Sequence, residues 1–337
     1  MHLAQSADSD MPLGSTAVPP VVLCFATSDA TAGAGLQSDV LTLASMGCHP
    51  LSVLAAIAVR DTRGVEELLA LDADVVDAQA RALLEDIPVQ AFKLGMVGSV
   101  ENVAAIAEIL SDYPDVPLVL EPALSVVDGE EAAGEDMLAA LAELVLPQVT
   151  VLVASRSEIL QLAAMTPLNE EGEESEEGEE GEEGEDAVDS DDFAELFPPV
   201  ADEDDANEGG EEAEAEDDAL SLADAIARLL GRGVGHVLLT GGGEPGPQVV
   251  NVLVGREGVV RTDAWERLSG PFLGAGATLA AALAGALAHG MTVPEAAREA
   301  QEFTWQALSG AYRPGMGMAL PDRFFWARGA EDDNAEA

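Results

Sequence analysis

The chain contains almost no lysine and very little cysteine. Of its 337 residues, 64 are Asp or Glu but only 14 are Lys or Arg, and Lys93 is the single lysine. With a formal net charge of −50 the protein cannot neutralise a phosphate backbone, which excludes nucleic acid as a partner. The two cysteines, Cys24 and Cys48, form neither a disulfide framework nor a metal-binding spacing. Such cysteine usage suits a reducing compartment, and we expect a cytoplasmic protein.

Long uninterrupted apolar runs are also missing. The best candidate for a membrane span, residues 271–289, is mostly Ala and Gly and is better explained as a buried helix. The first 19 residues lack a basic region followed by an apolar core, so they predict a disordered lead-in rather than a secretory signal. We therefore expect no membrane association.

Acidic residues are concentrated in one segment of low complexity. Glu170–Asp218 holds 27 Asp or Glu residues and no Lys or Arg. A segment of this composition buries too little apolar area to offset the entropy of ordering, which predicts a disordered insert over 169–218. The apolar island "FAELFPPV" at 193–200 leaves two alternatives open: a simple spacer, or a docking motif for a protein partner.

The rest of the chain is acidic as well. Outside the segment, 37 acidic residues stand against 14 basic ones, and residues 329–337 form an acidic tail. Acidic surfaces with almost no lysine are of a halophilic type, because salt screens the repulsion between like charges. We take this as a hypothesis about the conditions in which the protein works.

Apolar β-branched runs alternate with helical patterns along the chain. Strands are predicted at 21–26, 49–59, 89–95, 117–122, 149–154, 236–241, 248–254 and 257–263. Helices are predicted at 33–47, 73–85, 99–112, 130–145, 156–165, 219–232, 276–289 and 293–310. Strands buried on both faces and alternating with helices predict a parallel sheet between two helical layers. The pattern fits one domain made of residues 20–168 and 219–328.

Chemistry in such a sheet is expected at the carboxyl ends of its strands. Gly274, Ala275 and Gly276 open a helix there, where backbone N–H groups bind anions such as phosphate. Glu121 and Glu158 follow two other strands, and carboxylates are the hard oxygen ligands that Mg²⁺ prefers. The strand ends alone therefore favour a phosphotransferase, although each glycine turn could equally serve only to pack its helix.

Seven ordered segments resemble the hydroxymethylpyrimidine/phosphomethylpyrimidine kinases, which are thiamin-pathway members of the ribokinase-like superfamily. The matching segments are "VVLCFATSDATAGAGLQSDV", "AFKLGMVGS", "VLEPALS", "VLVASRSEILQL", "HVLLTGGG", "GPFLGAGATLAAALAGALAHG" and "AAREAQEFTWQALSGA". The resemblance covers residues 21–326 apart from the acidic insert. It implies a three-layer α/β/α sandwich with a mainly parallel central sheet. It also implies ATP and Mg²⁺ as cofactors, a small pyrimidine alcohol as substrate and a homodimer.

The resemblance also assigns roles to individual positions. Gly274, Ala275 and Gly276 match the family's anion hole, and Ala277 stands where the family has its catalytic Cys. Glu121 and Glu158 match the metal side of the site. Substrate-binding positions are Thr27, Asp29, Gly33, Gly35, Asp39, Arg60 and Met96, and ATP-binding positions are Ser155, Thr240, Gly241 and Gly242.

Several of these positions depart from the family pattern. The family has Gly at Thr27, Pro at Ala30, Gln at Arg60, Asp at Glu121 and Asn at Ser155, besides Cys at Ala277. Arg60 would bring a positive charge that favours an anionic ligand such as a phosphorylated pyrimidine, or it would simply pair with a nearby carboxylate. Thr278 is a poor base and points elsewhere, so no side chain of "GPFLGAGATLAA" replaces the missing Cys.

Three functions remain open at this point. The first is ATP-dependent phosphorylation of 4-amino-5-hydroxymethyl-2-methylpyrimidine, its monophosphate or both, impaired by the loss of the general base. Such a base typically contributes about 10²- to 10⁴-fold to the rate. The second is a non-catalytic protein that binds a pyrimidine or nucleotide. The third is a kinase for a pyridoxal-type vitamer.

Overall fold

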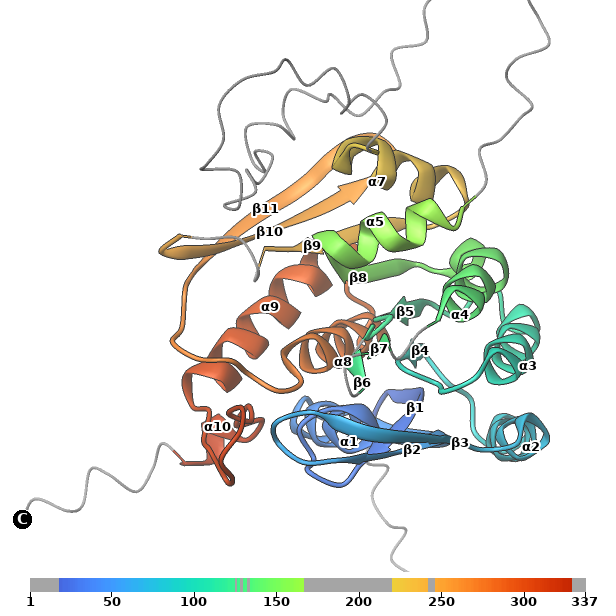
Figure 1. Cartoon of the computed structure of the whole chain (residues 1–337), viewed down its shortest axis with the longest axis horizontal. Helices are drawn as coiled ribbons and strands as arrows, with labels where there is room; N and C mark the ends of the chain where they lie inside the picture. Colours follow the sequence, from blue (N-terminus) through green and yellow to red (C-terminus); the bar gives the residue numbers. More distant parts are fainter. Residues whose placement is uncertain are drawn as a thin grey trace, which may run out of the picture.

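One large sheet organises the molecule, as the computed structural model in Figure 1 shows. The structure describes residues 18–124, 126–127, 130–131, 134–166, 220–241 and 246–328. Within these ranges the strands form an 11-stranded sheet in the order β11-β10-β9-β8-β5-β4-β1-β2-β3-β6-β7. The lead-in, the acidic insert and the acidic tail lie outside the described residues, as does the island at 193–200.

The central strands are short and apolar on both faces. The strands are β1 (Val21–Asp29), β2 (His49–Arg60), β3 (Val65–Ala70), β4 (Ala91–Leu94), β5 (Leu118–Leu120), β6 (Val126–Val127), β7 (Glu130–Glu131), β8 (Val151–Ser155), β9 (His236–Thr240), β10 (Gln248–Gly255) and β11 (Gly258–Glu266). The strands from β9 through β8, β5, β4 and β1 to β2 pair in parallel, whereas β3, β10 and β11 join the sheet by antiparallel pairs. Parallel pairing requires helical crossovers on both faces, which explains the two-sided burial.

Helices cover both faces of the sheet and complete a three-layer α/β/α sandwich. They are α1 (Gly35–Ser45), α2 (Ala73–Leu84), α3 (Val100–Ser111), α4 (Glu135–Ala140), α5 (Arg156–Ala164), α7 (Leu222–Gly231), α8 (Ala275–Ala288), α9 (Val293–Ser309) and α10 (Phe325–Arg328). One face packs against α1, α8 and α9, and the other against α2, α3, α4, α5 and α7. The Ala-rich α8 lies against β1, β4, β5 and β8, and its small side chains allow this close approach.

The fold differs from the expected elements in two places. The helix expected over 130–145 begins only at Glu135, after Gly134, and it ends as a π-helical turn over Leu141–Val145. Residues 130–131 pair with β6 instead. The sequence does not predict strand β3, because "VEELLA" carries two glutamates. In the structure this strand is exposed along most of its length. β3 forms because it pairs with β2 through a tight turn.

The parallel strands bring their carboxyl ends to one edge of the sheet. The N-terminus of α8 lies over this edge, and the loop after β1 lies beside it. This edge is where ligands bind in open α/β sheets. Among the helices of the described ranges, none combines the length and apolar character that a bilayer crossing needs.

Candidate active site

Two cavities of similar size open at the carboxyl edge of the sheet. The first, of about 420 Å³, lies over the ends of β1, β2, β4 and β5 and is called here the acceptor cavity. The second, of about 440 Å³, lies over β9, β10 and β11 and is called the nucleotide cavity. Phe272, Ala275 and Gly276 line both cavities, so the two spaces meet at the N-terminus of α8. The arrangement allows two small molecules to approach each other at one helix end.

The turn that begins α8 has a backbone that only glycine adopts easily. Gly274 has φ +82°, and a Cβ there would lie 1.8 Å from the carbonyl oxygen of Gly33. Thr278 turns away from the cavity, because its hydroxyl donates to the Gly274 carbonyl oxygen at 2.8 Å. The N–H groups of the first helical turn lack intrahelical acceptors and carry the positive end of the helix dipole. They are therefore available to bind a phosphate.

Ala277 lies in this first turn and lines the acceptor cavity together with Gly274, Ala275 and Gly276. Its side chain is 4% exposed and can neither accept nor donate a proton. The positions expected to form an anion hole lie at a helix N-terminus, and Ala277 provides no side-chain base there.

Lys93, the only lysine, is buried at the floor of the acceptor cavity. Its Nζ lies 3.2 Å from Asp39 Oδ1 and 3.6 Å from Glu121 Oε2, and its side chain is 1% exposed. Burial alone would lower the pKa of Lys93, but the carboxylates of Asp39 and Glu121 raise it above its ordinary value. Burial also raises the pKa of Asp39, which Lys93 opposes. The three side chains form a buried charge cluster in which each carboxylate depends on the same cation.

Glu121 reaches from this cluster to the anion hole. A Cβ built on Gly276 would lie 3.0 Å from Glu121 Oε1, so the carboxylate lies against the first turn of α8. The pKa of Glu121 is raised to about 7. Burial is the main cause, the positive charge of Lys93 opposes the rise, and the nearby charge of Glu158 adds to it. A carboxyl with this pKa changes its charge near neutral pH.

Glu158 is held in place by the start of α5. Its Oε2 accepts hydrogen bonds from Ser155 N and Ser155 Oγ, both at 2.8 Å. Glu158 N donates to Ser155 Oγ at 3.5 Å, and this bond and the one from Ser155 N form a capping box. Within the described residues no group of three or more His, Cys, Asp or Glu side chains is arranged to hold a metal ion. The pair Glu121 and Glu158 nevertheless fits Mg²⁺, because this ion commonly takes one or two carboxylates and completes its shell with water and phosphate oxygens.

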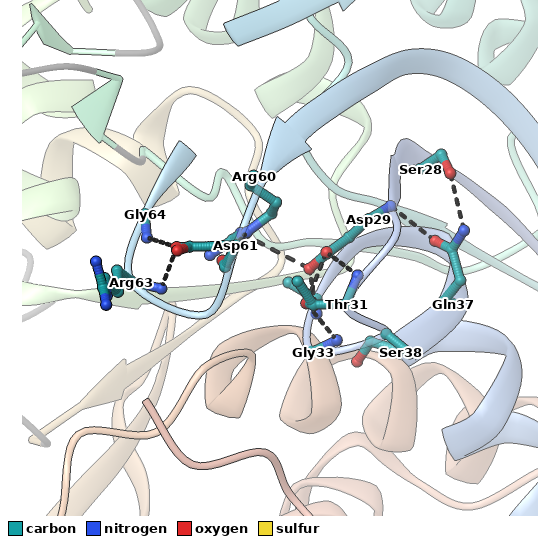
Figure 2. Close-up of polar contacts among 12 residues, drawn as sticks. Ser28, Asp29, Thr31, Gly33, Gln37, Ser38, Arg60, Asp61, Arg63 and Gly64 are labelled. Atoms are coloured by element: carbon teal, nitrogen blue, oxygen red, sulfur yellow. Dashed lines mark hydrogen bonds and ion pairs between the residues drawn. The ribbon is translucent and has the colours of Figure 1, made fainter. Parts of the chain in front are cut away.

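The loop after β1 is organised by Asp29 (Figure 2). Its Oδ1 accepts from Thr31 N at 2.8 Å and from Thr31 Oγ1 at 2.7 Å, and its Oδ2 accepts from Ala34 N at 2.9 Å. Arg60 approaches from the end of β2, with Nη1 3.7 Å from Asp29 Oδ2. The alternative that Arg60 pairs with a nearby carboxylate is thus observed, although at a long distance.

A second buried arginine, Arg323, locks this loop to the helices. Its guanidinium donates to the carbonyl oxygens of Ala32 and Gly33 at 3.1 and 2.7 Å. It also donates to Ser38 Oγ at 2.7 Å and to Thr278 Oγ1 at 3.0 Å. Burial lowers the pKa of Arg323 to about 10, so the side chain stays charged at neutral pH. Arg323, which precedes α10, therefore connects the loop after β1 to α1 and α8 by hydrogen bonds.

The expected substrate positions divide into two groups. Thr27, Asp29, Gly35, Arg60 and Met96 line the acceptor cavity. Gly33 and Asp39 are not among its lining residues. A Cβ at Gly33 would lie 2.5 Å from the side chain of Leu273, so this glycine serves close packing. Asp39 is fully buried behind Lys93 and faces the cavity only through that lysine.

The expected ATP positions are more dispersed. Thr240 lines the nucleotide cavity. Gly241 packs closely, since a Cβ there would lie 2.1 Å from the Val250 carbonyl oxygen, and its N–H donates to Asn251 Oδ1 at 3.0 Å. The hydroxyl of Ser155 is engaged in capping α5. Gly242 lies outside the described residues.

Sequence reasoning assigned no role to several residues of the two cavities. Trp265 and Trp305 stack with ring centroids 6.2 Å apart in the wall of the nucleotide cavity, and Arg298 lies 4.5 Å over Trp265. Tryptophan at only three positions of the chain was a usable signal. Lys93 was equally visible as the single lysine of an acidic chain. Arg323 carried no signal, because only the fold brings it under the loop.

Comparison with known proteins agrees with this geometry. The family model for phosphomethylpyrimidine kinase matches residues 29–183 and 205–322. The hydroxymethylpyrimidine/phosphomethylpyrimidine kinase of Streptomyces coelicolor is 30% identical over 317 residues, which cover 92% of this chain and 96% of that protein. The corresponding protein of Rhizobium meliloti is 29% identical over 293 residues, which cover 87% and 92% of the two chains.

Solved structures share the fold at lower identity. The pyridoxal kinase from Staphylococcus aureus in complex with ADP matches with a TM-score of 0.70 and 21% identity, over 92% of this chain and 96% of that one. The phosphomethylpyrimidine kinase from Clostridium difficile 630 matches with a TM-score of 0.60 and 23% identity, over 86% and 99% of the two chains. Because the family model spans most of the chain and the curated relatives match it almost end to end, this chain belongs to the phosphomethylpyrimidine kinase family.

Proposed function

We propose that the chain is an ATP- and Mg²⁺-dependent kinase that phosphorylates 4-amino-5-hydroxymethyl-2-methylpyrimidine, its monophosphate or both in thiamin biosynthesis. The observation that carries the proposal is the meeting of the two cavities at the N-terminus of α8. A nucleotide over β9 and β10 would direct its terminal phosphate at this helix end. An acceptor over β1 and β2 would bring its oxygen to the same place.

The chain's own residues supply positioning and charge stabilisation, which dominate phosphoryl transfer. The N–H groups of the first turn of α8 would stabilise charge on the transferring group. Glu121 and Glu158 would hold Mg²⁺, which neutralises phosphate charge when bound. Lys93 would keep the floor of the cavity from repelling phosphate, because it offsets part of the charge of Asp39 and Glu121.

The missing base shapes this proposal. Ala277 cannot remove the proton of the acceptor hydroxyl, and the general base of such a reaction typically contributes about 10²- to 10⁴-fold. We therefore expect slow turnover. The same observation favours a second candidate, a protein that binds a pyrimidine or a nucleotide without catalysis.

An ADP-release assay on the hydroxymethylpyrimidine and on its monophosphate separates these two candidates. Turnover that requires both acceptor and Mg²⁺ supports the kinase. Absence of turnover, together with a rise in melting temperature on adding acceptor or nucleotide, supports the binding protein. If neither ligand changes the melting temperature and no ADP is released, both candidates fail.

The homodimer stays a proposal as well. Ile57 and Leu69 are 41% and 45% exposed and lie opposite each other in the pair of β2 and β3, with Val59 nearby at 40%. This apolar strip would be covered by a second copy of the chain. Light scattering should give twice the monomer mass, and Leu69→Glu should reduce it to the monomer value.

A further inference from the structure

Two arginines lie at the acceptor site, and their hydrogen bonding is very different. The guanidinium of Arg323 donates five hydrogen bonds of 3.2 Å or shorter to Ala32, Gly33, Ser38 and Thr278. Arg60, whose side chain is 8% exposed, makes one hydrogen bond within the described residues, from Nε to the Asp61 carbonyl oxygen at 3.4 Å. A guanidinium has five N–H donors, so most donors of Arg60 have no acceptor among the described residues and can reach a ligand in the cavity.

The ion pair with Asp29 does not satisfy Arg60. The nearest atoms are 3.7 Å apart, which exceeds hydrogen-bond distance. Both oxygens of Asp29 already accept hydrogen bonds from Thr31 or Ala34 (Figure 2). Asp29 is therefore committed to the loop, and the guanidinium of Arg60 keeps donors free on the side that lines the acceptor cavity.

A second arginine lines the same cavity. Arg63, in the turn between β2 and β3, lines the acceptor cavity too, and its side chain has no ion pair in the described part of the chain. Both arginines also line a neighbouring hollow of about 520 Å³ that extends between Thr31 and Pro314. The cationic end of the cavity thus has room for a charged substituent.

Strand order places this end away from the point of transfer. Arg60 ends β2 and Glu121 follows β5, with β4 and β1 between them. Three strand spacings amount to about 14 Å at the backbone, which the two side chains shorten from both ends. An acceptor whose reacting oxygen lies at α8 therefore presents its opposite end to Arg60.

We propose that Arg60 and Arg63 form an oxyanion subsite that selects acceptors with a carboxylate or other anionic oxygen group opposite the reacting hydroxymethyl. Charge-assisted, bidentate hydrogen bonds from an arginine fork supply the selectivity. This inference rests on the proposed kinase function for the orientation of the acceptor. The group in question is not the phosphate of the pyrimidine monophosphate, because a phosphate that receives a second phosphoryl group has to lie at α8.

The test compares acceptors that differ only at the ring position opposite the hydroxymethyl. Suitable probes are the 2-carboxylate and the 2-phosphonate analogues of 4-amino-5-hydroxymethylpyrimidine, with the neutral 2-carboxamide as the matched control. Melting-temperature titrations give each affinity without requiring turnover, and ADP release gives kcat/KM. The wild-type protein should prefer an anionic probe over the carboxamide by about ten- to a hundredfold. The two anionic probes show whether the planar or the tetrahedral oxyanion fits better.

Variants then assign the preference to this subsite. Arg60→Gln should reduce the preference for the anion to about twofold or less, and Arg63→Gln should reduce it partly. Arg256→Gln removes the same charge from the exposed turn between β10 and β11 and should leave the preference unchanged. If Arg60→Gln does not fold, Arg63→Gln, in the exposed turn between β2 and β3, still shows whether the preference depends on this subsite.

Equal affinity of the wild-type protein for the carboxamide and both anions overturns the inference, even if all three are phosphorylated. A preference for an anion that survives Arg60→Gln also overturns it. Binding of an anion that depends on Arg60 but produces no ADP supports the subsite and contradicts the kinase. The two proposals can therefore fail separately.

Discussion

Ala277 presents a methyl group to the acceptor cavity in the first turn of α8. Ala277→Cys would place an ionisable group in the first turn of α8, where the helix dipole favours a thiolate. If the protein is a slow kinase, kcat should rise by about 10²- to 10⁴-fold. Ala277→Ser is the matched control, because its hydroxyl is of similar size but is a poor base. Equal rates for the two variants would contradict a missing base as the cause of slow turnover.

Glu121 makes the stability of the protein depend on pH. Burial raises its pKa to about 7, from an ordinary value of 4.5, so the folded protein holds this proton more tightly than the unfolded chain does. The free energy of unfolding should therefore fall as pH rises from about 4.5 to about 7. The loss in free energy of unfolding should be at most about 3 kcal/mol, because the side chain is 16% exposed and solvent screens part of the effect.

Urea unfolding of Glu121→Gln across this pH range, without Mg²⁺, measures the effect. The variant should lose less stability with rising pH than the wild-type protein. Glu108→Gln, on the exposed face of α3, should behave like the wild-type protein. Parallel pH profiles for all three proteins would show that Glu121 does not titrate as its surroundings imply.

At the scale of elements, the start of α8 depends on Gly274. Gly274→Ala would place a Cβ 1.8 Å from the Gly33 carbonyl oxygen at a positive φ, so the turn or the loop would have to move. Gly290→Ala is a matched control, because Gly290 has φ +84° but nothing within 4 Å of its Cβ position. A left-handed alanine alone costs about 1 to 2 kcal/mol.

Thermal unfolding and ligand-induced melting shifts compare the two variants. Gly274→Ala should lose more stability than Gly290→Ala. If the N–H groups of α8 bind phosphate as proposed, it should also lose the melting-temperature shift produced by nucleotide, because the start of the helix is displaced. Equal losses in both respects would mean that the contact with Gly33 does not hold the turn in place.

How far the sequence predicts the structure also depends on the kind of element. Buried strands such as β1 were predictable, because a strand buried on both faces is a continuous apolar run. Amphipathic helices such as α9 were predictable, because their apolar residues recur with helical periodicity. β3 was not, because its pairing with β2 decides its conformation against its charged composition. The start of α8 was predictable as a glycine turn before a helix. The positions of Asp39 and Arg323 behind the cavity depend on long-range packing, which no local pattern encodes.

At the scale of the whole molecule, charge is the dominant feature. With a net charge of −50, mutual repulsion opposes the folded state, and salt should relieve it. We propose that the melting temperature rises as potassium chloride is increased to molar concentrations and that it rises less in sucrose of equal osmolality. An unchanged melting temperature across the salt series would contradict the halophilic-type interpretation.

Replacing the acidic segment would show which part of the chain causes the response of the melting temperature to salt. Arg228 of α7 donates to the carbonyl oxygen of Ala163 at the end of α5, so the two helices that flank the segment are in contact. A short Gly/Ser linker in place of residues 169–218 should therefore preserve the fold. The salt response should persist, because the remainder still carries 37 acidic residues against 14 basic ones. Loss of the response in this variant would assign it to the segment alone.

The burial of Lys93 gives the molecule an unusual chemical property. Its only side-chain amine is 1% exposed and engaged with two carboxylates. Amine-reactive reagents should therefore acylate nothing on the folded surface except the α-amino group. Acylation of Lys93 requires the floor of the acceptor cavity to open. The rate of acylation at this single site, followed by mass spectrometry, would therefore measure how often the floor opens.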